Sequence, residues 1–264
     1  MSGPPCDAGG IPGDVNGDGF DDFIAAAPFY DNPEVDEGVV YLYLGSATGP
    51  TASPWIAEED VAGARLGFYV STAGDVNGDG YADLIVGASD YSAGQSYEGA
   101  AFIYQGSASG IADGDPVTAD TQLESNQADA YLGWSVSGAG DVNGDGYADV
   151  IVGSAAYTAG EAIEGAAFVF HGGMSGISDG NPTTANAQIE GNQASAWLGS
   201  SVSGAGDVDG EGYADVIVGA PDYDAGQGDE GIAAGFLGSD TGLARGNPTT
   251  GEALTASEQA GAPP

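Results

Sequence analysis

The sequence predicts an all-β protein, a β-propeller of four four-stranded antiparallel blades that forms a single domain over residues 1–264. Two observations support this fold class. One Asp- and Gly-rich block followed by an apolar run recurs four times along the chain. The chain also has 48 Gly, and its apolar runs are only five or six residues long and are bounded by Gly, Asn and Asp. Short runs of this kind between turn residues are typical of strands.

The spacing of the recurring block sets the number of blades. The blocks are GDVNGDGFDD, GDVNGDGYAD (twice) and GDVDGEGYAD, and their first Asp residues stand at 14, 75, 141 and 207, spaced by 61, 66 and 66 residues. A regular period indicates a repeat architecture, and β-solenoid repeats are usually much shorter than this. We therefore expect one blade per copy, at about 14–65, 66–131, 132–197 and 198–256.

Each copy contains four candidate strands. The first begins with Leu-Gly (Leu66, Leu132 and Leu198), the second is Asp-x-Ile-Val-Gly, the third follows a Glu-Gly pair, and the fourth is rich in Thr and Gln. The second and third strands are apolar nearly throughout, as expected for inner strands covered on both faces.

The first copy lacks the Leu-Gly opening strand, because Asp14 is preceded only by AGGIPG. The pattern therefore provides 15 strands, one fewer than four complete blades need. Three alternatives remain open: residues 1–13 fill the gap irregularly, another chain completes the blade, or the chain is an incomplete piece of a longer propeller. An unpaired edge invites pairing with another chain, so self-assembly by strand donation is one expectation.

The recurring turn has the pattern D-x-[DN]-x-[DE]-G-[FY]-x-D, which predicts a cation site. Side-chain oxygens at positions 1, 3, 5 and 9 and the backbone carbonyl at position 7 can surround an ion. Position 6 is always Gly, as a sharp turn requires. The predicted ligands are Asp14, Asn16, Asp18, Phe20 and Asp22; Asp75, Asn77, Asp79, Tyr81 and Asp83; Asp141, Asn143, Asp145, Tyr147 and Asp149; and Asp207, Asp209, Glu211, Tyr213 and Asp215.

The chemistry of these ligands indicates calcium. All are hard oxygens with no His or Cys nearby, which favours Ca²⁺ or Mg²⁺ over zinc or copper. Three carboxylates, an amide and a carbonyl suit the larger shell of Ca²⁺, so we expect up to four Ca²⁺ ions. The turn is not an EF-hand, because position 12 is Ala25, Val86, Val152 or Val218. The simpler alternative, that these are plain hairpin turns, does not explain four copies with one ligand spacing.

With these repeats and turns, the chain resembles the FG-GAP repeat family, found in the propeller of integrin α subunits and in many bacterial surface proteins. The Leu-Gly openings, the metal turns and the closing Gly219-Ala220-Pro221 carry the resemblance. It implies a propeller with calcium in the turn between the first and second strands of a blade, usually in an extracellular adhesion or recognition protein. The chain departs from the family in having four blades where integrins have seven, and Leu-Gly where the family has Phe-Gly.

The charge excludes two classes of partner. The formal net charge is −38, with Arg65 and Arg245 as the only basic residues besides one His. Such a chain repels nucleic acid and anionic membranes, and no apolar run approaches the ~20 residues of a membrane span. We expect no nucleic acid and no membrane insertion. The single Cys6 excludes a disulfide within one chain, and Met1–Gly10 lacks the basic start and apolar stretch of a signal peptide.

These features together predict an extracellular, secreted or cell-surface module, stabilised by calcium, that binds a protein or carbohydrate ligand. A self-assembling filament or surface-layer subunit is the alternative, and a polysaccharide-acting enzyme is disfavoured. The chain has one His, His171, no Lys and no Gly-x-Ser-x-Gly motif. Fourfold repetition of Glu37, Glu98, Glu164 and Glu230 favours a structural hydrogen bond over catalysis. Trp134 and Trp197, in or next to opening strands, are expected to pack rather than to form sugar platforms.

Overall fold

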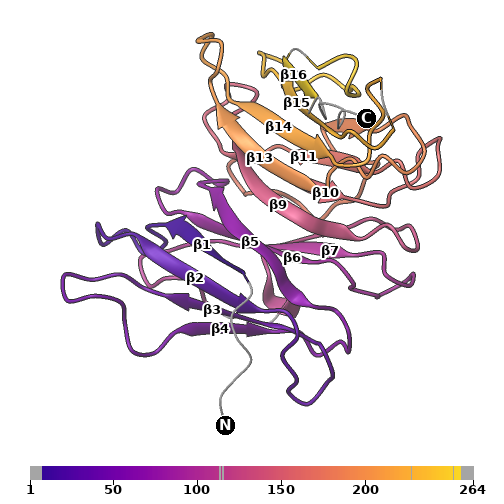
Figure 1. Cartoon of the computed structure of the whole chain (residues 1–264). Coiled ribbons are helices and arrows are strands. Elements are labelled where there is room, and N and C mark those ends of the chain that lie inside the picture. Colours follow the sequence, from indigo (N-terminus) through magenta and orange to yellow (C-terminus); the bar gives the residue numbers. More distant parts are fainter. Residues whose placement is uncertain (1–7, 113, 115, 227, 252, 257–264) are drawn as a thin grey trace, which may run out of the picture.

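The computed structural model describes residues 8–112, 114, 116–226, 228–251 and 253–256. This part of the chain forms sixteen strands in four four-stranded antiparallel sheets, which are the blades of a β-propeller (Figure 1). In each blade the strands lie side by side in the order in which the chain makes them. The all-β fold predicted from the repeat is confirmed.

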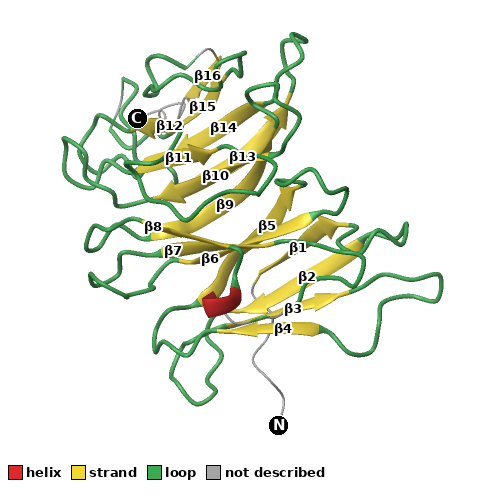
Figure 2. Ribbon diagram, turned by 180° about the vertical axis from the view of Figure 1, so that it is seen from behind, coloured by secondary structure: helices red, strands yellow, loops and turns green. Residues whose placement is uncertain are grey.

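The blades are built alike. Their first strands are β1 (Ala8–Gly13), β5 (Leu66–Gly74), β9 (Leu132–Gly140) and β13 (Ser201–Gly206). Their second strands are β2 (Asp22–Ala27), β6 (Asp83–Ala88), β10 (Asp149–Ser154) and β14 (Asp215–Ala220). The third strands are β3 (Val39–Tyr43), β7 (Ala100–Tyr104), β11 (Ala166–Phe170) and β15 (Ile232–Phe236). The fourth strands are β4 (Trp55–Glu58), β8 (Thr121–Glu124), β12 (Ala187–Glu190) and β16 (Ala253–Ala256), and one 3₁₀ turn covers Pro116–Thr118 (Figure 2).

The first blade obtains its opening strand from its own chain. Strand β1 pairs with β2 in the register Ala8 to Ala26 and Gly10 to Ile24, with an irregularity before Gly13 reaches Asp22. Residues before Asp14 therefore fill the gap irregularly, as the first alternative expected, and the first sheet includes β1 from Ala8. The first blade needs no strand from another polypeptide. Cys6 lies outside the described residues.

The inner blades are buried on both faces because a neighbouring blade packs on each side. In β6, Leu84 and Val86 join the core shared with the first blade, and Ile85 joins the core shared with the third. A third core cluster lies between the third and fourth blades. Alternate residues of a strand point to opposite faces. A strand packed between two blades is therefore apolar nearly throughout, as the sequence indicated.

The four blades form an open row. Strand β1 packs on β5, β5 on β9, and β9 on β13. The first and fourth blades lie at opposite ends of this row (Figures 1 and 2), and no comparably extensive contact joins them within the described residues. Each end blade consequently has one uncovered face, on which Phe23 is 39% exposed at one end and Ile217 is 41% exposed at the other.

The structure also bears on membrane insertion. No described helix is long and apolar enough to cross a membrane.

Candidate metal centres and an aromatic pocket

The four Asp-rich turns occupy the same place in every blade, between the first and second strands. All twenty ligands predicted from the sequence lie in these turns, at 14–22, 75–83, 141–149 and 207–215. The Gly at position 6 has a φ of +88° in the first turn and +100° in the fourth. A left-handed backbone of this kind is the reason why Gly stands there, so the predicted sharp turn is confirmed.

The first Asp of each turn organises the backbone around itself. Asp75 Oδ1 accepts the N–H groups of Gly78 at 2.7 Å and Asp79 at 3.1 Å, and Oδ2 accepts that of Gly80 at 2.9 Å. Asp141 and Asp207 accept the three equivalent bonds. The turn therefore curls around the carboxylate at position 1, and successive backbone N–H groups hold it in place.

The ninth residue ties the turn to the sheet. Asp83 is fully buried; its Oδ2 accepts the Val76 N–H and its Oδ1 the Gly106 N–H, both at 2.8 Å. Burial, more than the repulsion of Asp79 and Asp75, raises the pKa of Asp83 to about 7. Asp149 is held in the same way, and burial likewise raises its pKa to about 7. A bound cation favours the ionised form of such a carboxyl group, so these positions fit a metal ligand.

The fourth turn differs in its middle positions. In the first three turns the carboxylate at position 5 accepts the side-chain amide at position 3, as Asp79 does from Asn77 at 3.0 Å. In the fourth turn Asp209 replaces the amide, and carboxylate oxygens of Asp207, Asp209 and Asp215 lie within 4.8 Å of one another. Among the described residues, no other turn of the four brings three acidic oxygens so close. Glu211 does not belong to this group of three carboxylates. Ion binding by the twenty residues stays a prediction.

Each of the first three turns is covered by the next blade. The carbonyl of Asp14 accepts the N–H of Ala82 at 3.1 Å, and the carbonyl of Asp141 accepts that of Ala214 at 2.9 Å. The carbonyl of the residue after the first Asp, Val15, accepts the N–H of Ser107 at 3.1 Å. These bonds set the spacing between blades and hold each turn against its neighbour.

An aromatic pocket of about 400 Å³ crosses the junctions of the first three blades. Its lining residues are Arg65, Asp90, Tyr97, Tyr131, Trp134 and Trp197. Tyr131 stacks on Tyr97 at 5.9 Å and meets Trp134 edge-on at 6.1 Å. The Arg65 guanidinium pairs with Asp90 at 2.5 Å.

The sequence assigns Trp134 and Trp197 to packing. The structure adds that both side chains are half-buried in the wall of this pocket. The sequence contained one signal for this pocket, because Arg65, Tyr131 and Trp197 each stand directly before a Leu-Gly pair.

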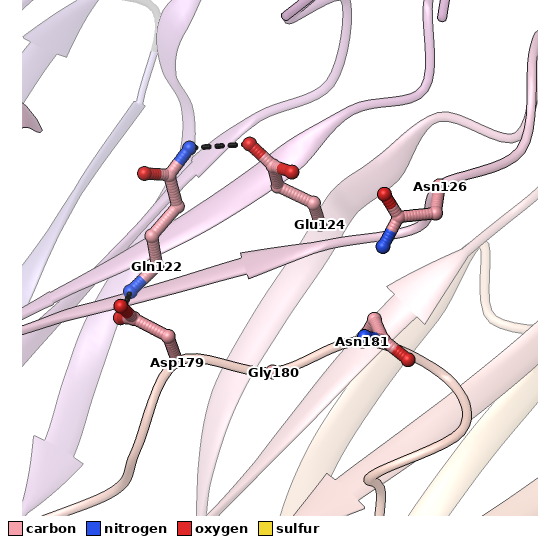
Figure 3. Close-up of a pocket in the computed structure, with 6 residues that line it drawn as sticks. All are labelled: Gln122, Glu124, Asn126, Asp179, Gly180 and Asn181. Carbon is pink, nitrogen blue, oxygen red and sulfur yellow. Dashed lines mark hydrogen bonds between the residues drawn. The ribbon is translucent and has the colours of Figure 1, made fainter. Parts of the chain in front are cut away.

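A second cavity, of about 260 Å³, lies between β8 and the segment 179–181 of the third blade (Figure 3). Its polar groups join the two blades. The N–H of Gln122 binds Asp179 Oδ1 at 2.8 Å, and the N–H of Gly180 binds the carbonyl of Gln122 at 3.0 Å. Because these groups already bind each other, we assign this cavity to the blade junction rather than to a ligand.

The recurring Glu residues act as structural acceptors in the second and third blades. Glu98 Oε1 accepts the N–H groups of Ala93, Gly94 and Gln95 at 3.0, 2.7 and 3.1 Å. Glu164 accepts three equivalent bonds between β10 and β11. The structural hydrogen bond predicted from the repetition is therefore confirmed at these two positions.

A propeller with one oxygen-rich turn per blade defines the class of protein to which this chain belongs. The model of the FG-GAP repeat matches residues 10–43, 68–104, 132–170 and 198–234, one segment in each blade. The chain belongs to the FG-GAP repeat family.

Curated relatives and solved structures are similar to parts of the chain. It is 34% identical to phosphatidylinositol-glycan-specific phospholipase D of Bos taurus over 72% of this chain and 24% of that protein. It is 37% identical to integrin alpha-PS2 of Drosophila melanogaster over 53% of this chain and 11% of that protein. The chain thus spans a quarter or less of these relatives. A crystal structure of the exotype rhamnogalacturonan lyase YesX aligns with 90% of this chain and 48% of that chain, with a TM-score of 0.48 and 15% identity. A likeness at this level supports no statement about activity.

Proposed function

We propose that this chain is a calcium-stabilised recognition module that acts outside the cell, where it binds a carbohydrate or protein ligand without chemical turnover. The observation that carries the proposal is the fourfold recurrence of one oxygen-rich turn whose ninth residue, such as Asp83, is buried in the sheet. The family resemblance supports the extracellular setting, and millimolar calcium outside cells suits turns of this type.

The energetic role of calcium follows from mass action. Sites in extracellular modules bind with a Kd of about 10⁻⁴–10⁻³ M. At tenfold saturation each ion adds about 1.4 kcal/mol to the free energy of unfolding, so four ions add about 5–6 kcal/mol. Domains are usually stable by only about 5–15 kcal/mol. Calcium in the four turns therefore decides whether the row of blades is rigid enough to present a binding surface.

The aromatic pocket is the proposed ligand site. Aromatic walls with a few polar groups are typical of small-ligand pockets, and here Trp134 and Trp197 provide flat apolar faces beside the Arg65–Asp90 pair. The formal net charge of −38 repels anionic polysaccharides. A neutral sugar, whose ring can lie against an aromatic face, therefore fits the pocket best.

Calcium dependence is tested by thermal unfolding of the full chain in calcium, in magnesium and in EGTA. The proposal expects the highest Tm in calcium and the lowest in EGTA, with up to four turn sites counted by calorimetry. A Tm that does not respond to EGTA overturns the calcium role.

Ligand binding is tested on a panel of neutral and acidic oligosaccharides. We expect a neutral sugar to bind, and Trp134→Ala to weaken binding at least tenfold. Phe23→Ala, a half-exposed aromatic residue on the free face of the first blade, is the matched control and leaves binding unchanged. The same panel reports catalysis, since released product would replace the recognition proposal with an enzyme.

Self-assembly is a second candidate function, and the two uncovered end faces favour it. Val208, Ile217, Phe236 and Leu237 line an apolar cavity of about 170 Å³ on the free face of the fourth blade. At the other end Phe23 stacks on Tyr43 with ring centroids 4.7 Å apart. The first blade of a second copy, docked on this fourth-blade face, would repeat the junction that the chain uses three times internally. No donated strand is needed.

This candidate is tested by light scattering over a range of concentrations in calcium. Assembly predicts a mass above that of one chain, which Ile217→Asp returns to monomer. Met174→Asp, at a surface position that is 85% exposed, is the control and keeps the assembly. A monomer at all concentrations removes this candidate and leaves the recognition proposal untouched.

A further inference from the structure

The first blade contains a buried carboxylate that lacks the donors its counterparts have. Glu37 precedes β3 at the position that Glu98 and Glu164 occupy in the next two blades. All three side chains are fully buried, with 0% exposure. Glu98 accepts three backbone N–H groups and Glu164 accepts four, whereas neither carboxylate oxygen of Glu37 has a hydrogen-bond partner. An ionised group buried without compensation is costly, so Glu37 calls for a different partner.

The local sequence explains why the donors are missing. Pro33 stands where Gly94 and Gly160 donate to their Glu at 2.7 and 2.6 Å. Proline has no N–H group, so the central donor of the cradle is lost. The first blade therefore cannot stabilise its Glu in the way that the second and third blades do.

Two further carboxylates replace the missing donors. Oxygens of Glu34, Glu37 and Asp60 lie within 4.8 Å of one another. Glu34 Oε2 is itself buried without a hydrogen-bond partner. Asp60 stands where the later blades have Asn126 and Asn192, and it opens this group to solvent. Burial first, and the neighbouring Glu34 second, raises the pKa of Glu37 to about 7.

We propose that Glu34, Glu37 and Asp60 form a fifth cation site, which binds one Ca²⁺ ion and uses none of the twenty residues of the Asp-rich turns. Three hard carboxylates, two of which have buried oxygens without a hydrogen-bond partner, favour a divalent cation as the shared ligand. The buried Glu37 anchors the ion, Glu34 joins it from the turn between β2 and β3, and the exposed Asp60 provides the path of entry. The ion does in the first blade what backbone N–H groups do in the second and third blades.

The competing arrangement is a proton shared between Glu34 and Glu37. A proton neutralises one charge and links one pair of oxygens, which leaves Asp60 without a role in the group. A divalent ion engages all three carboxylates at once. The two arrangements therefore differ in what a change at Asp60 does.

The experiment counts calcium ions on the full chain by calorimetry at pH 7.5. Asp60→Asn, which introduces the residue that the second and third blades carry, is expected to fold and to weaken one site about tenfold or more. The double variant Glu34→Gln with Glu37→Gln is expected to bind one ion fewer than the parent. Glu98→Gln, at a buried Glu whose Oε1 accepts three backbone N–H groups, is the matched control and keeps the parent ion count.

Hydrogen exchange of the segment 31–38 gives an independent readout. Calcium is expected to slow its exchange in the parent chain and not in Asp60→Asn, while the four Asp-rich turns respond equally in both. If Asp60→Asn and the double variant bind as many ions as the parent, with the segment unaffected by calcium, the proposal is overturned in favour of the shared proton. Failure of the four turns to bind calcium would leave this difference between parent and variant intact.

Discussion

The third and fourth Asp-rich turns have similar sequences and the same hydrogen bonds to their first Asp, but their surroundings differ. Asp141 and Asp207 each accept three N–H groups from their own turn. The carbonyl of Asp141 also accepts the N–H of Ala214 from the next blade at 2.9 Å, and no following blade covers Asp207 in the described part of the chain. Val142 is fully buried, whereas Val208 is 63% exposed.

The glycine that precedes each turn shows the same contrast. A Cβ atom placed on Gly140 would lie 2.6 Å from the Cβ of Ala214, and one placed on Gly206 would meet nothing within 4 Å. Both residues have positive φ, +76° and +70°. The local motif therefore determines the shape of the turn, whereas the neighbouring blade restricts its motion and shields it from solvent.

Calcium removal is the largest test of this contrast. Four ions worth about 5–6 kcal/mol should lower Tm in EGTA by about 10–20 °C for a chain of this size. If the neighbouring blade provides rigidity, the fourth turn loosens first as calcium becomes limiting. Hydrogen exchange at 207–215 should then rise before exchange at 141–149. Simultaneous loosening of both turns would show that the covering blade adds nothing.

Truncating equivalent apolar residues measures how much the covering blade contributes. Ile151, fully buried in β10, and Ile217, 41% exposed in β14, occupy the same position of the repeat. Ile151→Ala leaves a cavity between blades and should cost about 2–5 kcal/mol. Ile217→Ala should cost less than about 1 kcal/mol, because the side chain is already in contact with solvent. Denaturant unfolding compares the two, and equal losses would mean that the fourth blade is covered in solution.

A matched pair of glycine variants tests the close approach of the blades. Gly140→Ala and Gly206→Ala carry the same backbone strain, because both positions have positive φ. Only Gly140→Ala drives a methyl group against Ala214, so it should be less stable by a further 1–3 kcal/mol or so. Chemical unfolding in saturating calcium gives the difference. Indistinguishable variants would contradict the close approach seen in the structure.

The smallest expected effect is a dependence on pH that disappears when calcium is bound. Burial raises the pKa of Asp83 and Asp149 to about 7, above the ordinary value of 3.8. A carboxyl group with a raised folded-state pKa favours the folded state when protonated, and this contribution is lost as pH rises through 7. In EGTA, Tm should therefore fall between pH 5.5 and pH 8. Calcium should flatten the profile, and a flat profile in EGTA would contradict the raised pKa of Asp83 and Asp149.

Much of the fold and of the candidate site could be predicted from residues that are close together in the sequence. The nine-residue turns carry their predicted ligands and their Gly at fixed spacing, so each turn folds around its own first Asp whatever surrounds it. The second and third strands are apolar nearly throughout, and this pattern by itself indicates that both of their faces are buried. The same reasoning anticipated the cradle of Glu98 and Glu164.

Other features depend on segments that are distant in the sequence. The irregular strand that completes the first blade has no Leu-Gly signal, because backbone pairing with β2 rather than side-chain pattern defines it. The aromatic pocket brings together Arg65, Tyr131 and Trp197 from three blades. Repetition alone predicted one structural role for all four Glu residues, and it missed the carboxylate group around Glu37.

The sequence by itself determined the repeat, the strands and the oxygen-rich turns, because each depends on interactions within about ten residues. Only the tertiary structure decided which blade face is covered, which turn is exposed, and that Glu37 meets Glu34 and Asp60 instead of backbone donors. The physical reason is that burial and charge compensation are properties of packed neighbours. Identical local motifs therefore acquire different environments at the middle and at the ends of one row of blades.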